Sequence, residues 1–465
     1  MGYSLKIFVS LFIAYAFFTN FYLTTNDNPR FSLTAAIAEE HRFMIDSFYN
    51  RSFGQLSWDP NDLTLHRTWW NNVDYTVFNG HVYSDKAPMG SFLAVPFYFV
   101  ARLLTSDPGV LEFICSLFVS GLLTALTGVF IYRIGGYLTD DEGLRVIVAL
   151  SYGLGSMAFS YATVFFPHNI SAFFVFGCFF VLFLVKRKRL SDNYIFLAGF
   201  LAASAALSDY YMLLVGFCLL VYCFSFARGS VAKFMIPFVL TLLLLPLYHY
   251  ALFGNPLVFP LNYHATFNQE HSQGFYGVLE PNLDVAVRLL FSPYKSVFFF
   301  NPLLILSVIL FPRFYRAHRL EALVVASVSI LLFVFNDMYY AWDGGSCVGP
   351  RHLCALIPFM LLPLFSLRRK GFEQNLLIFF FILGLAINFI YVNSRMHVLP
   401  LDLGPFVVDV PIIPMASNAL NQAFLHYGVA LSFTTGIVIA FFLYVLWSKE
   451  LAGFFKRFPF MPKRD

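Results

Sequence analysis

Charged side chains are scarce in this sequence. Asp, Glu, Lys and Arg make up 12% of its 465 residues, against about 25% in a typical soluble domain. Hydrophobic residues reach 59%, and the mean hydropathy is +0.69. This balance excludes an ordinary soluble enzyme and predicts an all-α polytopic membrane protein. The net charge of +4 is too small to indicate a nucleic-acid partner.

Cysteine is also sparse and follows no recognisable pattern. The six cysteines include no CxxC pair and no metal-ligand spacing, and five of them lie in or beside apolar runs. This favours small apolar packing residues over a disulfide framework. Internal repeats, low-complexity tracts and a separate soluble domain are lacking as well.

Long apolar runs, in contrast, are abundant. Because about 20 apolar residues cross a bilayer, twelve runs are candidate spans: 5–23, 110–132, 146–166, 170–185, 194–208, 211–226, 234–253, 296–311, 321–341, 353–367, 375–392 and 426–447. One further run, Met89 to Leu104, contains Pro96 and Arg102. It is short for a span and suits a helix lying at the membrane interface.

The positions of Lys and Arg predict the topology. If 89–104 does not cross, the basic clusters all fall on the side of Lys6, as in the loops 186–189, 313–319 and 368–370. Because basic loops mark the cytoplasmic side, we expect both termini there. The prediction is a single membrane domain over 1–465, with a first external loop 24–109, a transmembrane core 110–392, an external loop 393–425 and a basic tail 448–465.

Asp27 follows directly on the first apolar run. An ionisable group at that depth is costly unless it is used or paired. Its functional interpretation is a general base or a metal ligand. The alternatives are a helix cap, since Pro29 suits the first turn of the next helix, and an ion pair with Arg30.

The motif Asp85-Lys86-Ala87-Pro88 opens the interfacial helix. The free N–H groups of a helix start and the Lys86 ammonium would together suit an anion such as phosphate. The alternative is a surface Lys–Asp pair, which would contribute little.

A glycine-containing segment, Trp342 to His352, ends in Arg351 and His352. Its three glycines allow close backbone approach, and Arg binds phosphate bidentately. The alternative is a plain loop with an interfacial Arg. Further substrate-binding candidates share positions in external turns or loops, where an interfacial polar belt is the competing interpretation: Asp85, His168, Asp209, Tyr210, His264 and His352. The spacing of His264 and His271 predicts no metal site.

These motifs resemble those of the C-type (GT-C) membrane glycosyltransferases. The resemblance rests on an acidic residue after the first helix and on a Lys-x-Pro element that opens a juxtamembrane helix. Within GT-C, the pattern is similar to lipid A aminoarabinose transferases, protein O-mannosyltransferases and related prokaryotic members. The resemblance extends over roughly residues 20–400 and includes the strings GHVYSDKAPMGSFLAVPFYF, LFGNPLVFPLNY and WDGGSCVGPRHL. Ala87 departs from the pattern, because a proline often stands there.

The resemblance implies a polyprenyl-phosphate sugar donor and an inverting transfer on the non-cytoplasmic face. Asp27 would match the catalytic carboxylate and Lys86 the phosphate-binding position. A lipid or glycan acceptor fits the lack of a large soluble domain. A divalent metal is possible, because members of the family differ in whether they use one. The alternatives are a transporter or lipid flippase and a non-catalytic subunit of a glycan assembly machine. Ionisable residues at helix ends, rather than at the bilayer midplane, favour the enzyme.

The topology can be tested with a cysteine at position 187. In a background without reactive native thiols, Arg187→Cys should react with an impermeant maleimide only after the membrane is permeabilised, because its loop is predicted to be cytoplasmic. Labelling of sealed cells from outside would contradict the predicted orientation.

Overall fold

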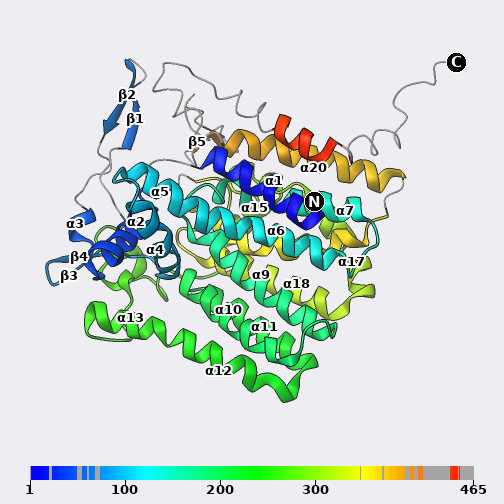
Figure 1. Cartoon of the computed structure of the whole chain (residues 1–465), viewed down its shortest axis with the longest axis horizontal. Coiled ribbons are helices and arrows are strands. Elements are labelled where there is room, and N and C mark those ends of the chain that lie inside the picture. Colours follow the sequence, from blue (N-terminus) through cyan, green and yellow to red (C-terminus); the bar gives the residue numbers. More distant parts are fainter. Residues whose placement is uncertain are drawn as a thin grey trace.

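The computed structural model (Figure 1) describes residues 2–19, 24–49, 55–59, 62–68, 74–345, 347–368, 371–392, 398–402, 407–411, 440–448 and 450. It is 73% helix and 3% strand, which confirms a mostly helical protein. Most of the predicted loop 393–425, of the tail 448–465 and of the run 426–447 lies outside the described residues. All six cysteines are free, as predicted.

The helices of the bundle are α1 (Tyr3–Phe18), α5 (Pro108–Ser116), α6 (Leu122–Gly135), α7 (Glu142–Gly153), α8 (Ala158–Tyr161), α9 (Pro167–Lys186), α10 (Ile195–Ser208), α11 (Met212–Phe226), α12 (Val231–Leu242), α13 (Leu244–Phe253), α16 (Val297–Phe300), α17 (Leu303–Ala317), α18 (Arg319–Met338), α19 (Ile357–Met360) and α20 (Gly371–Val392). Shorter connecting turns of helix are η2 (Leu117–Gly121), η3 (Asp192–Tyr194), η4 (Arg228–Ser230), η6 (Arg351–Leu356) and η7 (Leu362–Ser366).

Five helical stretches are long and apolar enough to cross a membrane: Pro108–Gly135, Pro167–Lys186, Arg228–Phe253, Arg319–Met338 and Gly371–Val392. Shorter apolar helices are Tyr3–Phe18, Met89–Arg102, Met212–Phe226 and Arg351–Ser366. The described chain is therefore built as an integral membrane protein. The count of twelve spans and the side on which the termini lie stay predictions.

Several predicted runs are interrupted where the sequence suggested continuous helices. The run 146–166 divides into α7 and α8, and the amide of Met157 at the break donates to Oδ1 of Asn301 at 3.0 Å. This side-chain acceptor satisfies a buried N–H that the interrupted helix leaves free. The run 353–367 divides into η6, α19 and η7, with Pro358 and Pro363 at the starts of the last two, because proline cannot continue a helix interior.

The first loop folds over one end of the bundle, at the left of Figure 1. It contains α2 (Asn28–Ala35), η1 (Ala36–Glu40), α3 (Asp46–Tyr49), α4 (Met89–Arg102) and two antiparallel hairpins, β1 (Gln55–Asp59) with β2 (Asp62–Thr68) and β3 (Thr76–Phe78) with β4 (His81–Tyr83). A third hairpin joins β5 (Val398–Asp402) and β6 (Val407–Pro411). The expected helix over 89–104 is confirmed as α4, and α2 packs on it, where Ser91 Oγ donates to the Arg30 carbonyl at 2.9 Å.

The hairpins were not predicted, although one carries a recognisable signal. Asn79 and Gly80, between β3 and β4, both have positive φ, at 48° and 80°. Asn-Gly is the favoured pair for such tight hairpin turns. The second loop over the bundle end, 254–295, contains η5 (Pro260–Tyr263), α14 (Asn268–His271) and α15 (Leu283–Phe291).

The two ends of the described chain meet. A helical segment over 440–448, red in Figure 1, lies near α1 and α20. The Trp447 indole N–H donates to Ser10 Oγ at 2.9 Å, and Lys6 Nζ lies 2.5 Å from Glu450 Oε1.

Close helix packing gives a test of the bundle. A Cβ at Gly199 would collide with the carbonyl oxygen of Phe234, where α10 crosses α12. A Cβ at Gly177 would make only ordinary contacts, at 3.5 Å and beyond. Small residues let membrane helices approach in this way.

Gly199→Ala should therefore destabilise the protein by about 1–3 kcal/mol through overpacking. The measurement is thermal unfolding in detergent. Gly177→Ala is the matched control, and equal unfolding temperatures for the two variants would contradict the packing of α10 on α12.

Candidate functional site

Asp27 is fully buried at the start of the first loop. Its Oδ2 accepts hydrogen bonds from the Thr24 amide at 3.2 Å and the Thr24 hydroxyl at 2.8 Å, while Oδ1 is buried without a partner. The side chain makes no capping bond to α2, so the cap interpretation is wrong, although Pro29 does stand in the first turn. Burial raises the pKa of Asp27 to about 6, against the opposing hydrogen bonds from Thr24 and the charge of Arg30.

Glu112, in α5, lies within electrostatic reach of Asp27. It is buried, its Oε1 accepts from Ser116 at 3.0 Å, and its Oε2 has no partner. Sequence reasoning missed this residue because it falls inside a predicted span. A carboxylate within an apolar run was the available signal.

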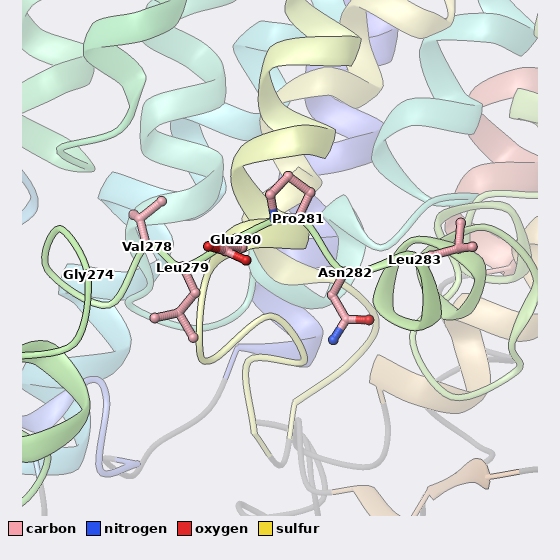
Figure 2. A pocket seen from close by; sticks show the side chains of 7 residues that line it. All are labelled: Gly274, Val278, Leu279, Glu280, Pro281, Asn282 and Leu283. Carbon is pink, nitrogen blue, oxygen red and sulfur yellow. The ribbon is translucent and has the colours of Figure 1, made fainter.

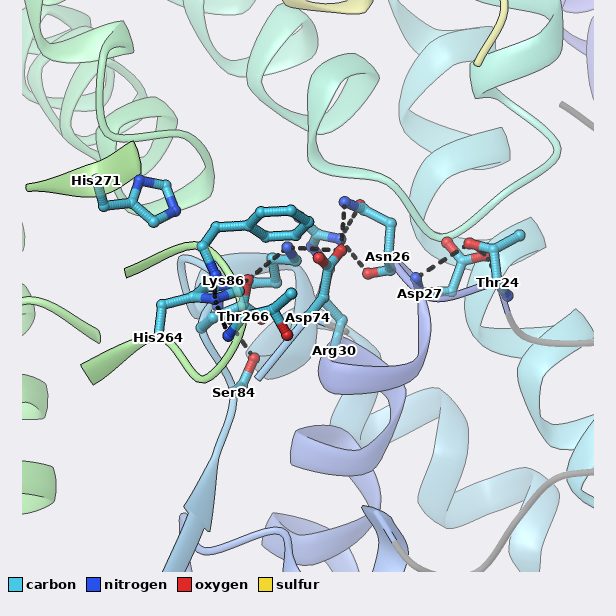
Figure 3. A network of polar contacts seen from close by, with 12 residues as sticks. Thr24, Asn26, Asp27, Arg30, Asp74, Ser84, Lys86, His264, Thr266 and His271 are labelled. Carbon is cyan, nitrogen blue, oxygen red and sulfur yellow. Dashed lines mark hydrogen bonds and ion pairs between the residues drawn. The ribbon is translucent and has the colours of Figure 1, made fainter. Parts of the chain in front are cut away.

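Lys86 lies between two carboxylates (Figure 3). Its Nζ is 2.5 Å from Asp85 Oδ2 and 3.0 Å from Asp74 Oδ2. Burial raises the pKa of Asp85, but the Lys86 ammonium and the His264 ring outweigh burial, so the net pKa lies well below its usual range. Asp74, which sequence reasoning missed, also accepts from Asn26 Nδ2 at 3.3 Å. The first-loop residues are thereby linked into one polar network.

His264 has a defined tautomer. Its Nδ1 accepts from the amides of Thr266 and Phe267 at 3.2 and 2.9 Å, so the proton of the neutral ring lies on Nε2. Nε2 is 3.4 Å from Asp85 Oδ2 and points its N–H toward that carboxylate. The His271 ring packs against the His264 ring, with centroids 5.2 Å apart (Figure 3).

Asp74, Asp85 and His264 could hold a metal ion, since their ligand atoms lie within 4.8 Å of one another. Two carboxylates and one imidazole are donors that suit a divalent cation. In the present arrangement Lys86 already supplies the positive charge between the carboxylates. A metal at His264 Nε2 would also have to displace the proton that the two backbone N–H groups place there. The donors fit a metal, and Asp85 Oδ1 is buried without a partner, but Lys86 already pairs with the other Asp85 oxygen and with Asp74.

Arg30 lies at the centre of the charged residues. It is buried, its Nη1 donates to the carbonyl oxygen and to Oδ1 of Asn26, both at 2.7 Å, and its Nε has no partner. The ion pair with Asp27, which was one alternative interpretation of that residue, does not form. Instead Asp27, Asp85 and Asp209 are all within electrostatic reach of Arg30, as is Arg351. Burial lowers the pKa of Arg30 despite these three carboxylates.

Two turns between helices meet at His168 and Asp209. His168 stands at the start of α9, and its Nδ1 lies 3.0 Å from Asp209 Oδ2 in the turn before α11. Burial raises the pKa of Asp209 to about 6, although His352, Arg30 and Arg351 favour its charged form. The His352 ring stands perpendicular to that of His168, with centroids 5.3 Å apart. Tyr210 faces away, toward Phe259 and His249, and its hydroxyl has no partner.

Arg351 is positioned by the glycine-containing segment before it. Its guanidinium stands 5.7 Å from the centre of the Phe166 ring, and its Nε is buried without a partner. The fully buried Lys295 donates to the carbonyls of Gly345 at 3.1 Å and Cys347 at 2.5 Å. These bonds fix the segment, and sequence reasoning did not single out Lys295 for this task.

The fold thus brings Asp27, Lys86, Asp85, Asp209, His168, Arg351, His352 and His264 to one end of the bundle around Arg30. Trp69 and Trp70, which could stack on a sugar, lie outside the described residues. Tyr83 packs on Phe253, with centroids 5.8 Å apart.

An open pocket of about 740 Å³ lies elsewhere in the second loop (Figure 2). Its lining runs along one extended strip, Gly274 and Val278 to Leu283, and includes only one charged side chain, Glu280. None of the candidate residues lines it. The charges, rather than this pocket, therefore define the candidate site.

Comparison with known proteins identifies the fold. No protein-family model matches the sequence, and no curated protein matches it either. Among solved structures, ArnT from Cupriavidus metallidurans bound to undecaprenyl phosphate superimposes with a TM-score of 0.51 at 15% identity, over 97% of this chain and 71% of that one. The oligosaccharyltransferase of Archaeoglobus fulgidus gives a TM-score of 0.49 at 12% identity, over 83% and 56%. ArnT is a GT-C glycosyltransferase, so the resemblance to GT-C proteins is confirmed at the level of the fold.

The position of Arg351 can be tested through the glycines beside it. Gly344 and Gly345 have nearly equal positive φ, at 69° and 71°, so an alanine strains both alike. A Cβ at Gly344 would also lie 2.8 Å from Arg351 Nε and 2.9 Å from Cys347 Sγ, whereas one at Gly345 meets nothing within 4 Å. Gly344→Ala should therefore lower the unfolding temperature more than Gly345→Ala.

The extra loss should shrink when Arg351 is replaced by alanine, because only the contact with Cys347 Sγ then still separates Gly344→Ala from Gly345→Ala. Thermal unfolding of Gly344→Ala and Gly345→Ala, each with and without Arg351→Ala, measures the difference. An extra loss of unchanged size without the Arg351 side chain would show that Gly344 does not adjoin it.

Proposed function

Because the chain has the fold of a GT-C membrane glycosyltransferase, we propose that it transfers a sugar from a polyprenyl-phosphate donor to a hydroxyl of a lipid or glycan acceptor, with inversion, on the non-cytoplasmic face. The observation that carries this proposal is the gathering of three cations, Arg30, Lys86 and Arg351, with the buried carboxylate Asp27 at one end of an apolar bundle. Cations would bind the phosphate of a lipid headgroup, and a buried carboxylate would act as the base in its transfer reaction. ArnT was solved with undecaprenyl phosphate, which supports the same ligand class here.

Lys86 and Arg351 have hydrogen-bonding capacity left for a phosphate. A Lys ammonium carries three N–H donors, and Asp74 and Asp85 account for two of those of Lys86. Arg351 stacks on Phe166 and leaves its Nε without a partner among the described residues. Fixed cations of this kind stabilise the charge that grows on a departing phosphate. We assign both residues to the donor phosphate.

Asp27 has the properties of a base for the acceptor hydroxyl. With a pKa of about 6 it is ionised at neutral pH and yet more basic than an ordinary Asp. In the proposed step the acceptor oxygen bonds to the anomeric carbon, the bond from that carbon to the phosphate oxygen breaks, and the hydroxyl proton passes to Asp27. Such a base contributes typically 10²–10⁴-fold. Its unpartnered Oδ1 is the oxygen that we expect to take the proton.

The donor lipid has a route along the membrane face of α4. This helix begins just after Lys86, and exposed apolar side chains lie at its far end, Phe99 and Val100, and directly after it, Leu103 and Leu104. A polyprenyl tail lying in the bilayer beside this helix would have its phosphate near Lys86. Buried apolar chain contributes about 0.8 kcal/mol per CH₂ group, so the tail supports binding while the cations position the headgroup.

The test uses purified protein in lipid discs with undecaprenyl phosphate and undecaprenyl-phosphate sugars. Asp27→Asn should reduce transfer at least about 10²-fold while binding of undecaprenyl phosphate is retained. Lys86→Ala should weaken that binding about tenfold or more, because a charge-assisted hydrogen bond is lost. Full transfer by Asp27→Asn would exclude it as the base, and a wild-type protein that binds no lipid phosphate would end the proposal.

The pH dependence follows from the raised pKa of Asp27. Transfer needs the ionised carboxylate, so the rate should fall as the pH drops through about 6. Asp209 has a similar pKa, so the assignment requires a comparison. The fall in transfer rate at low pH should persist in Asp209→Asn. If it disappears in that variant, the titration belongs to Asp209 instead of Asp27.

A further inference from the structure

His352 is a buried histidine with unused hydrogen-bonding capacity. It is 8% exposed, and both of its ring nitrogens are buried without a partner. The Ala341 backbone lies near the ring but forms no hydrogen bond of normal geometry with it. Leaving a buried polar group unpaired costs about 1–3 kcal/mol, so both nitrogens of this imidazole are available to a hydrogen-bonding ligand.

His168 offers a second nitrogen toward the same place. Asp209 is ionised at neutral pH, since its pKa is about 6, and it therefore accepts the Nδ1 proton of His168 across 3.0 Å. The lone pair of the neutral ring is then on Nε2. No described residue makes a hydrogen bond to that nitrogen. The carboxylate thus orients His168 as a hydrogen-bond acceptor.

Aromatic rings enclose the two histidines. Tyr161 and Phe166 stand edge-on to His168, at centroid distances of 5.6 and 6.1 Å. Tyr339 and Tyr211 stand edge-on to His352, at 5.4 and 6.0 Å. Aromatic walls around a few convergent polar groups are typical of small-molecule sites.

The position of this cluster relative to the cations identifies its place in the site. His352 follows Arg351 in the chain, and Phe166 contacts both the Arg351 guanidinium and the His168 ring. A group bonded directly to a phosphate held by Arg351 would therefore lie against the two histidines. In a polyprenyl-phosphate sugar, that group is the sugar ring.

The hydrogen-bonding character also fits a sugar. A neutral His352 supplies one donor and one acceptor, and His168 supplies an acceptor. Hydroxyl groups both donate and accept, whereas phosphate oxygens of an ionised phosphodiester only accept. On this basis we propose that His168, oriented by Asp209, and His352 form the subsite for hydroxyls of the transferred sugar, separate from the phosphate subsite of Lys86 and Arg351. This inference rests on the proposed function and names where its sugar lies.

The test compares two ligands that differ only by the sugar. The affinity for undecaprenyl phosphate is measured beside that for undecaprenyl phosphate carrying glucose, mannose or aminoarabinose. The sugar that increases the affinity of the wild type is then used for all variants. His352→Phe preserves the aromatic ring and removes both nitrogens. His168→Asn preserves a donor to Asp209 and removes the acceptor at the position of Nε2, which the shorter side chain does not reach. Each variant should bind the sugar-bearing donor about tenfold more weakly, as expected for one lost hydrogen bond, and undecaprenyl phosphate as tightly as the wild type.

Two controls make the result decisive. His249→Phe is a matched substitution, because His249 is 1% exposed, also has an unpartnered nitrogen, and contacts Tyr210 and Phe259 rather than the cluster. It should leave both affinities unchanged. Lys86→Ala should weaken both ligands together, because they share the phosphate.

Equal weakening of both ligands by His352→Phe and His168→Asn would reduce the cluster to a structural role and overturn the inference. So would unchanged affinities, or a wild type in which no sugar adds affinity to the lipid phosphate. Failure of the wild type to bind any of these lipids would instead refute the proposed function itself, so the two failures are distinguishable.

Discussion

The burial of several charges around Arg30 is the constraint on which this end of the molecule depends. Removing a charge from water costs several kcal/mol, and only well-placed opposite charges and hydrogen bonds offset that cost. Arg30 is held by Asn26 and stands within reach of Asp27, Asp85 and Asp209. These carboxylates come from the start of the first loop, its end, and a turn between two helices. Because all three carboxylates are stabilised by the charge of Arg30, these separate segments are held in one arrangement.

Long apolar runs made much of the helical frame predictable. The runs 194–208, 211–226 and 375–392 correspond closely to α10, α11 and α20, because in a membrane a continuous apolar stretch has to satisfy its backbone as helix. Interruptions were harder to predict. The break after α7 depends on Asn301, which lies 144 positions from its partner Met157. Composition within the run gives no sign of such a distant acceptor.

The candidate site was predictable as separate residues and not as contacts. Asp27, Lys86 and Arg351 each stood out because a charge beside an apolar run requires a reason. Asp74 and Glu112 escaped notice and Lys295 was given no role, since each acquires its importance only from what the fold sets beside it. The pair of His168 and Asp209 illustrates the same limit. Both turns were marked as polar, but nothing local in either turn specifies the other as its partner.

The meeting of the two chain ends has a consequence for the path between them. Lys6 and Glu450 are in direct contact, and Trp447 is hydrogen-bonded to α1. Two groups in contact cannot lie on opposite faces of a bilayer. The polypeptide between positions 6 and 450 must therefore traverse the membrane an even number of times, whichever of its helices cross. That parity rule constrains every topology drawn for this chain, and it follows from a single ion pair rather than from any hydropathy profile.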